Sequence, residues 1–442
     1  MKKFLKTAGF ISALLFMSLC ISSCSDNNDD DNNDSGYTVD DFKKCYYDNS
    51  SKKEITFLLD TEIWGIEEEL TNAHVRGSFT TWKDEEDFKL SKDSGGKFYS
   101  VTVPYSKIST LGNSGHPEYK FNIDGTDNGY LTAKDVIDEP YCFHTSDYNL
   151  ILIFEGEDLE DIKACSQTAG TWKFLEDWNL ETADDQTKEK FANFRAVPGT
   201  TNVYRSWHPF KVKYHKDGSS KYLRNTEPER VKMVTSLYEK YEIKTDICLS
   251  GDETKSLATY KVRDIDLKTE LEEYTESVPS YYQNLVDAGN VCNVSYTPNG
   301  STSAITPEYK YIYQSDYNEE YLNGWLQNII DFVKEDHPAP YNIHCRLGND
   351  RTGYYCAVVA GLCGATWEAI AADYQTSNNT YLGEYRDQRL LKQVFEKQFN
   401  NGNDISKVSN LKELMYTYYT TNDELKISKD DLDALVAKFT AK

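Results

Sequence analysis

The sequence predicts an α/β domain with a central, mostly parallel sheet and flanking helices over residues 170–442, preceded by a β-sandwich over residues 37–165. Strand-like runs between turn residues dominate the first part. From about residue 170, helical patterns alternate with short apolar runs, an order typical of a parallel sheet covered by helices. The chain of 442 residues is 39% hydrophobic and 13% aromatic, which is enough apolar material for sizeable cores.

Residues 1–23 have the features of a signal peptide. Three lysines among the first six residues precede an apolar stretch, Phe10 to Leu19, which is too short to span a bilayer as a helix. The run Ile21-Ser22-Ser23-Cys24 resembles the lipobox of bacterial lipoproteins. This resemblance implies cleavage before Cys24 and lipid modification of that cysteine. The alternative is an ordinary secretory signal with an incidental cysteine.

Residues 24–36 are rich in Asp and Asn and contain no apolar residue after Cys24, which predicts a disordered tether. An acidic run behind a lipidated cysteine resembles the export tether of surface-displayed lipoproteins in some Gram-negative bacteria. We therefore expect a lipid-anchored protein at the outer membrane or cell surface. The chain has 72 acidic and 48 basic residues, a formal net charge of −24, which disfavours nucleic acid as a partner.

Several strand-like runs between turn signals predict the β-sandwich. They are Lys53–Asp60, the run that begins at His74, Gly96–Val103 and Glu118–Gly125. Their order, with Trp82 in a turn, resembles the early-set immunoglobulin-like domains that include the glycogen-binding modules of kinase β-subunits and starch-branching enzymes. The resemblance implies a possible glycan partner, with Trp82 stacked on a sugar ring. The alternative is that Trp82 packs in the sandwich core, because we find no second tryptophan of the kind that those modules use.

In the second part, helical spacing of apolar residues predicts helices, and short apolar runs predict strands. Lys244–Leu249 and Tyr341–His344 are the expected strands. The expected helices are one that starts at Thr226, then Glu320–Val333, Arg351–Leu362, Thr366–Tyr374 and Glu384–Phe399. Cys356 and Cys363 fall in an apolar helical stretch and are expected as buried free thiols.

A single run carries the chemistry: His344-Cys345-Arg346-Leu347-Gly348-Asn349-Asp350-Arg351-Thr352-Gly353. A tight turn from a strand into a helix points successive backbone N–H groups into one concavity, where the helix N-terminus adds partial positive charge. Gly348 allows the turn to close, and Arg351 can bind two phosphate oxygens at once. The same donors lower the pKa of a cysteine thiol. The run therefore predicts phosphomonoester hydrolysis by a cysteine nucleophile.

The spacing of Cys345, Arg351 and Thr352 resembles the motif of the protein-tyrosine-phosphatase superfamily. The resemblance implies that Cys345 attacks phosphorus and forms a phosphocysteine, and that Arg351 binds the phosphoryl oxygens. Thr352 would hydrogen-bond the thiolate and help it leave, and His344 would orient the Cys345 backbone. The remaining residues of the phosphate-binding loop are Arg346, Leu347, Gly348 and Asn349. No metal and no cofactor are expected.

Three further elements resemble one branch, the atypical bacterial tyrosine/serine phosphatases with an HCxxGKDRTG loop. They are Asn193-Phe194-Arg195, Tyr204-Arg205-Ser206 and Asp373-Tyr374 followed by Ser377-Asn378. The resemblance covers about residues 190–400. Two departures stand out: Asn349 replaces the loop lysine, and Cys248-Leu249-Ser250 replaces an Asp-Leu-Arg run, so support of the loop by that Asp/Arg pair is in doubt.

The leaving group needs a proton, which a nearby carboxyl group usually supplies. By resemblance, Asp350 is the candidate general acid, because it lies inside the loop beside Arg351. Its alternative role is to form a salt bridge or to orient Arg351. Asp264, Asp266 and Asp316, on connecting segments, are further alternatives, and solvation at the surface is the more ordinary role for each.

The first functional expectation is a protein tyrosine phosphatase, or a dual tyrosine/serine phosphatase, that acts on phosphorylated proteins or small phosphomonoesters. The second is an inositol-phosphate or phosphoinositide phosphatase. Such enzymes tend to have Gly at the place of Asp350 and a more basic pocket, so this expectation ranks lower. The third, from another class, is a glycan-binding surface lipoprotein whose loop only binds anions.

Overall fold

The computed structural model describes residues 36–123, 130–131, 143–145, 148–157, 182–209, 215–216, 223–224, 227–250, 259–265, 271–277, 279–314, 316–380, 385–422 and 425–442. The predicted signal peptide, Cys24 and the tether up to residue 35 lie outside these residues. Residues 39–442 form one compact unit. Among the described helices, none is both long and apolar enough to cross a membrane.

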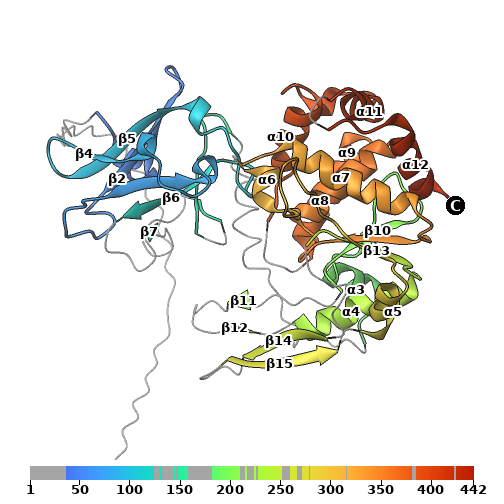
Figure 1. Cartoon of the computed structure of the whole chain (residues 1–442). Helices are drawn as coiled ribbons and strands as arrows, with labels where there is room; N and C mark the ends of the chain where they lie inside the picture. The colour runs from blue at the N-terminus through green and yellow to red at the C-terminus, as the bar shows by residue number, and fades with distance from the viewer. Residues whose placement is uncertain are drawn as a thin grey trace, which may run out of the picture. The chain divides into compact units, whose positions relative to one another are not determined.

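The N-terminal part of this unit contains two antiparallel sheets (Figure 1). The first has the order β1-β2-β5-β4, with strands Tyr46–Asn49, Glu54–Asp60, Phe98–Pro104 and Ser91–Lys92. In the second, β6 (Glu118–Ile123) pairs with β3 (Ala73–Gly77) and with the short strands β7 (Tyr130–Leu131) and β8 (Leu150–Ile151). The strand expected over 118–125 is observed as far as Ile123, where this described range ends. A short helix, α1 (Val39–Lys44), precedes β1.

One hydrophobic core joins the two sheets. Ile55, Phe57 and Leu59 alternate along β2, so their side chains share one face of the first sheet, and all three are fully buried. They belong to the same core as Val75 of β3 and Phe121 of β6, which are also fully buried. This shared core is consistent with the expected sandwich.

The C-terminal part is a mixed α/β arrangement around a five-stranded sheet with the order β16-β13-β17-β10-β9. The strands are Val291–Asn293, Thr245–Cys248, Tyr341–His344, Val203–Ser206 and Arg195–Ala196. All neighbouring pairs are parallel except β10 with the edge strand β9. As predicted, the sheet is therefore mostly parallel. The strand β17, which leads into the signature run, is at its centre, and its carboxyl end is where open α/β sheets bind ligands.

Helices cover both faces of this sheet (Figure 1). One group packs on the face that contains Ile247 and Ile343 and forms the main core. It comprises α6 (Tyr309–Tyr313), α7 (Glu319–Lys334), α8 (Asp350–Leu362), α9 (Trp367–Thr376), α10 (Gln388–Phe399), α11 (Leu411–Thr421) and α12 (Lys429–Thr440). The other group is α3 (Asp185–Phe191), α4 (Glu227–Lys240) and α5 (Ser280–Asp287). Residues of α4 and α5 contribute to a second core with Trp207, and α3 contacts α4.

The structure differs from the sequence expectations at the start of one helix and in two hairpins. The helix expected from Glu384 begins at Gln388, because Asp387 caps it and its carboxylate accepts a hydrogen bond from the Arg389 amide at 2.8 Å. The chain also forms a hairpin that we did not predict, from β14 (Thr259–Ile265) and β15 (Leu271–Ser277). Two short hairpin strands, β11 (His215–Lys216) and β12 (Leu223–Arg224), complete the described strands.

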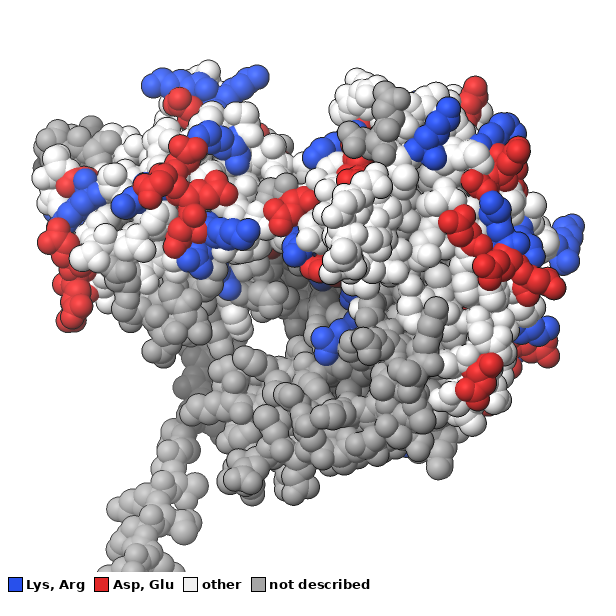
Figure 2. Space-filling model, in the orientation of Figure 1, with Lys and Arg blue, Asp and Glu red and all other residues white. Residues whose placement is uncertain are grey.

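Acidic and basic side chains are interspersed over the described part of the face that Figure 2 shows. The excess of carboxylates over cations in the chain opposes anionic ligands at long range. A phosphate site must therefore produce its positive potential locally.

Candidate active site

The signature loop lies between the end of β17 at His344 and the start of α8 at Asp350. Cys345 is its first residue and is 3% exposed. Gly348 has φ +75°, and a Cβ atom there would lie 2.6 Å from the Ser206 carbonyl oxygen and 2.8 Å from Asn193 Nδ2. Only glycine avoids both the strained backbone and these clashes, so the loop closes as the sequence predicts.

Every carbonyl group from Cys345 to Gly348 accepts a hydrogen bond from a protein donor. The donors to these four carbonyl oxygens, in order, are His344 Nδ1 at 3.0 Å, the His208 amide at 3.3 Å, Asn193 Nδ2 at 3.1 Å and Arg205 Nη2 at 2.6 Å. With its carbonyl groups held in this way, the loop has the strand-to-helix arrangement in which backbone N–H groups can bind a phosphoryl group.

A buried ion network fixes two of these donors. Arg205 is fully buried, and its Nη1 pairs with Asp373 Oδ2 of α9. Arg195 Nε donates to Asp373 Oδ1 at 2.6 Å, and Arg195 Nη1 donates to Asn193 Oδ1. Although burial raises the pKa of Asp373, the charges of Arg205 and Arg195 outweigh it and the net pKa is lowered. Ser377 accepts from Arg195 Nη2 at 3.0 Å. The three elements that carried the resemblance thus meet behind the loop.

A second buried network holds His344, and the sequence analysis missed it. His344 Nε2 lies 2.7 Å from Asp246 Oδ2 of β13, and both side chains are fully buried. The Tyr238 and Tyr282 hydroxyls also donate to Asp246, at 2.7 and 2.9 Å. Burial opposes both charges, but the pair interaction outweighs it, so the pKa of His344 is raised and that of Asp246 is lowered. An acidic residue in a buried strand was the signal that could have indicated this partner.

The surroundings of Cys345 favour its thiolate. Burial alone raises the pKa of the thiol, but the positive charge of Arg351 and the hydroxyl and amide of Thr352 outweigh it, so the net pKa is lowered. The Thr352 hydroxyl is buried and has no other partner among the described residues, so it is available to the sulfur. The part of Thr352 in releasing the thiolate, which the resemblance implied, stays a prediction.

Two carbonyl groups position Arg351 at the start of α8. Its Nη1 donates to the Leu249 oxygen at 3.1 Å, after β13, and to the Pro307 oxygen at 3.3 Å, before α6. The segment Cys248-Leu249-Ser250 stands where the related enzymes have Asp-Leu-Arg. It still contacts the signature run, because the Leu249 carbonyl group accepts a hydrogen bond from Arg351. Arg351 and Cys345 come together as predicted.

Asp350 forms an ion pair with Arg386, which the sequence analysis did not consider. Arg386 Nε pairs with Asp350 Oδ1, and Arg386 Nη2 lies 3.2 Å from Oδ2. Both carboxylate oxygens are thus engaged. We expected Asp350 either as a general acid or as a residue that forms a salt bridge or orients Arg351. These contacts show a salt bridge, with Arg386 as the partner. Among the alternative acids, Asp316 is exposed and Asp266 lies outside the described residues. Asp264 lies in strand β14 and not, as we expected, on a connecting segment.

The remaining loop residues differ in where their side chains lie. Leu347 packs into the second core with Trp207, and Arg346 is half-buried. Asn349 is 1% exposed, and its Oδ1 accepts from Asn193 Nδ2 at 3.0 Å. Asn349 Nδ2 is a buried donor without a partner among the described residues. At the position where the related loop has lysine, this chain therefore offers an uncharged amide donor.

His208, Cys248 and His344 form a buried cluster whose possible ligand atoms lie within 4.8 Å of one another. Both ring nitrogens of His344 already have hydrogen-bond partners, namely Asp246 and the Cys345 carbonyl group. A metal would have to displace one of these contacts. All six described cysteines are free thiols, including Cys356, which is buried, and Cys363, which is partly buried.

The His344–Asp246 pair makes stability depend on pH. Because the pKa of His344 is raised, its contribution is complete below about pH 6.5 and is lost as the pH rises through the raised value. Because the pKa of Asp246 is lowered, its contribution is complete above about pH 4 and is lost as the pH falls through the lowered value.

We expect Asp246→Asn to reduce the free energy of unfolding by about 3 kcal/mol at about pH 6, and by less at about pH 9. Urea-induced unfolding of both proteins at the two pH values measures this difference. A cost that is the same at both would show that His344 is not protonated in the folded protein.

Comparison with known families gives one match. Residues 247–440 match a family model described as the tyrosine phosphatase family. A search of curated proteins and a search of solved structures return no match. The matched segment contains the whole signature loop, α8, Asp373 and Arg386, whereas Asn193, Arg195 and Arg205 precede it. The segment 247–440 of this chain is therefore similar to the tyrosine phosphatase family.

Proposed function

We propose that the protein hydrolyses phosphomonoesters through a phosphocysteine intermediate on Cys345, and that its substrates are proteins with phosphotyrosine, or with both phosphotyrosine and phosphoserine. The match of residues 247–440 to the tyrosine phosphatase family supports phosphomonoester hydrolysis in general. The observation that carries the finer proposal is a buried cysteine with a lowered pKa, placed where a strand enters a loop whose carbonyl groups are all bonded elsewhere.

In the proposed reaction, the Cys345 thiolate attacks phosphorus opposite the leaving oxygen. The S–P bond forms as the P–O bond breaks, and the leaving alkoxide or phenoxide takes up a proton from solvent. Water then attacks the phosphocysteine and gives up a proton to solvent, the S–P bond breaks, and hydrogen phosphate and the thiolate are released. Arg351 and the loop amides stabilise the phosphoryl oxygens in both steps, and Thr352 stabilises the departing thiolate.

Cys345→Ser tests the nucleophile. We expect turnover of p-nitrophenyl phosphate to fall by at least about 10⁴-fold, because an alcohol cannot replace a thiolate at neutral pH. Binding of inorganic phosphate, measured by calorimetry, should remain. Cys356→Ser is the control, since Cys356 is buried in α8 and burial, its largest influence, raises its pKa to about 12. Full activity of Cys345→Ser would disprove the mechanism.

Asp350→Asn tests the proton donor. Because both carboxylate oxygens contact Arg386, we propose that Asp350 acts as an ion-pair partner. The substitution should then change kcat for aryl and alkyl phosphates by similar factors, within about threefold of each other. A much larger loss on alkyl phosphates, whose leaving groups need the proton most, would restore Asp350 as the general acid.

A substrate panel separates the enzyme proposals. It compares a phosphotyrosine peptide, a phosphoserine peptide, inositol hexakisphosphate and a phosphorylated glucan. We expect the phosphotyrosine peptide to have the highest kcat/KM, because Asn349 replaces a loop cation and the chain is acidic overall. A preference for inositol hexakisphosphate would favour the inositol-phosphate alternative.

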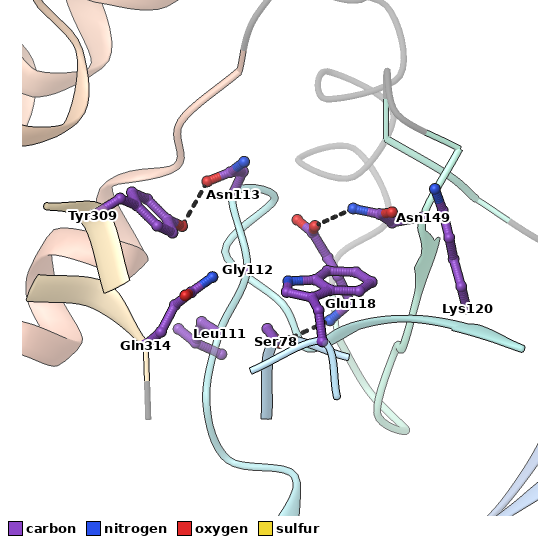
Figure 3. Close-up of a pocket in the computed structure, with 10 residues that line it drawn as sticks. Ser78, Leu111, Gly112, Asn113, Glu118, Lys120, Asn149, Tyr309 and Gln314 are labelled. Carbon is purple, nitrogen blue, oxygen red and sulfur yellow. Dashed lines mark hydrogen bonds between the residues drawn. The ribbon is translucent and has the colours of Figure 1, made fainter. Parts of the chain in front are cut away.

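As a second function, we propose that the N-terminal sheets form an immunoglobulin-like sandwich that binds a glycan. Trp82 is half-buried and lies outside the hydrophobic core of the sheets. It lines a pocket of about 290 Å³ (Figure 3), and both Thr81 and Trp82 have positive φ angles, which are unusual for such residues. These observations favour the sugar-stacking role of Trp82 over the core role.

Polar groups that suit an uncharged, hydroxylated ligand surround this pocket. Asn149 Nδ2 donates to Glu118 Oε2 at 3.1 Å, and the Ser114 amide donates to Glu118 Oε1 at 2.7 Å. These hydrogen bonds lower the pKa of Glu118, but burial raises it by more, so the net pKa is raised. Less free energy is therefore needed to keep the carboxyl group protonated and uncharged. Figure 3 shows Glu118 directed at Asn149.

Trp82→Ala tests the glycan proposal. We expect it to weaken binding of maltoheptaose by at least about tenfold, since stacking on an aromatic ring contributes much of the affinity for a sugar ring. Tyr47→Ala, on β1 and outside the pocket, is the control. Absence of maltoheptaose binding and of retention on an insoluble glucan in the unmodified protein would contradict the proposal. With a lipid anchor on Cys24, the protein would present both sites at the outer membrane or cell surface.

A further inference from the structure

Arg386 lies at a point where the phosphatase site and the N-terminal sheets are in contact. Its guanidinium group holds both oxygens of Asp350, the residue directly before the phosphate-binding Arg351. Asp350 is the only acidic residue of the signature run. An unpaired carboxylate at this position would repel a phosphoryl dianion and compete with it for the guanidinium group of Arg351.

The backbone on both sides of Arg386 is fixed. The Arg386 amide donates to Asn378 Oδ1 at 2.8 Å, and Asn378 Nδ2 donates to the Arg386 carbonyl oxygen at 3.0 Å. The amide of the next residue, Asp387, donates to the Asn113 carbonyl oxygen at 2.9 Å. Asp387 is 3% exposed and caps α10. The position of Arg386 thus depends on a residue of the N-terminal part.

Asn113 belongs to the segment Ser109–Gly115, which precedes β6 and packs on the phosphatase part. Three further hydrogen bonds hold this segment: Gln393 Nε2 to the Ser109 oxygen at 2.7 Å, the Leu111 amide to Gln393 Oε1 at 3.3 Å and the Tyr309 hydroxyl to Asn113 Oδ1 at 2.8 Å. Figure 3 shows the last of these. At Gly115, where φ is +77°, a Cβ atom would lie 2.7 Å from Cβ and Cγ of Asp387.

We propose that Arg386 is a positioning residue of the phosphatase site, which neutralises Asp350 so that Arg351 remains available to phosphate, and that the segment Ser109–Gly115 of the N-terminal part holds Arg386 in place. The inference rests on the proposed function and extends it: the N-terminal part completes the phosphate site. Removal of Arg386 should weaken oxyanion binding through the charge of Asp350, and removal of that charge should restore it.

A double-mutant cycle with tungstate, an oxyanion that resembles phosphate, tests this by calorimetry. We expect Arg386→Met to weaken tungstate binding about tenfold and Arg386→Lys, which keeps the charge, to weaken it less than about threefold. Asp350→Asn should bind at least as tightly as the unmodified protein. The double variant Arg386→Met/Asp350→Asn should return to within about threefold of it.

The cycle distinguishes a positioning role from a structural one. A double variant as weak as Arg386→Met, or an Arg386→Met variant with unchanged affinity, would overturn the proposal. Turnover of p-nitrophenyl phosphate by the unmodified protein is scored separately. Its absence would defeat the proposed function, while the tungstate affinities would still decide the role of Arg386.

A pair of glycine variants tests the contribution of the N-terminal segment. Gly115→Ala should displace Asp387 and weaken tungstate binding at least about threefold. Gly156→Ala is the matched control, because Gly156 also has a positive φ, +87°, but no heavy atom of the residues that the structure describes lies within 4 Å of its Cβ position. Equal affinities for the two variants would show that the segment Ser109–Gly115 does not act on the phosphate site.

Discussion

The proposed phosphate site depends on one constraint: the carbonyl groups of the signature loop must point away from the ligand. Carbonyl oxygens that faced the concavity would repel a phosphoryl group, and unpaired ones would be costly in so buried a place. His344, the His208 amide, Asn193 and Arg205 bond all four of them. Because these donors are themselves buried and paired, the loop amides and Arg351 can provide local positive potential in a chain of net charge −24.

The sequence indicated this loop well because its parts are contiguous. A short strand, a glycine-containing turn and an apolar helix follow one another, and the observed bounds of β17 and α8 agree with the expected ones within one residue.

The residues that support the loop from behind were harder to infer. Arg195 and Asp373 are 178 residues apart, and His344 and Asp246 are 98 apart, so only the fold shows that they meet. Arg386 was expected inside the helix Glu384–Phe399 but lies before the observed start of α10, and its partner Asp350 had been paired with its neighbour Arg351 instead. The mostly parallel sheet was predictable from alternation, whereas the β14–β15 hairpin was missed.

The two proposed sites share the segment Ser109–Gly115. Asn113 lines the pocket near Trp82, and its carbonyl group bonds the amide that follows Arg386. Tyr309, which donates to Asn113, also lines the pocket and lies two residues after Pro307, whose carbonyl group accepts from Arg351. A ligand in the pocket would therefore contact the same residues that hold the phosphate site, which gives glycan binding and phosphatase activity a common structural element.

Cys345 is proposed to carry the phosphoryl group during turnover. The most direct measurement is to quench the reaction with acid during turnover of p-nitrophenyl phosphate and to locate the bound phosphate by mass spectrometry of peptides. We expect one phosphorylated peptide, with the phosphate on the sulfur of Cys345, and its absence when the reaction is run with Cys345→Ser. Turnover with no phosphate on Cys345, or with phosphate on another residue, would disprove the phosphocysteine mechanism.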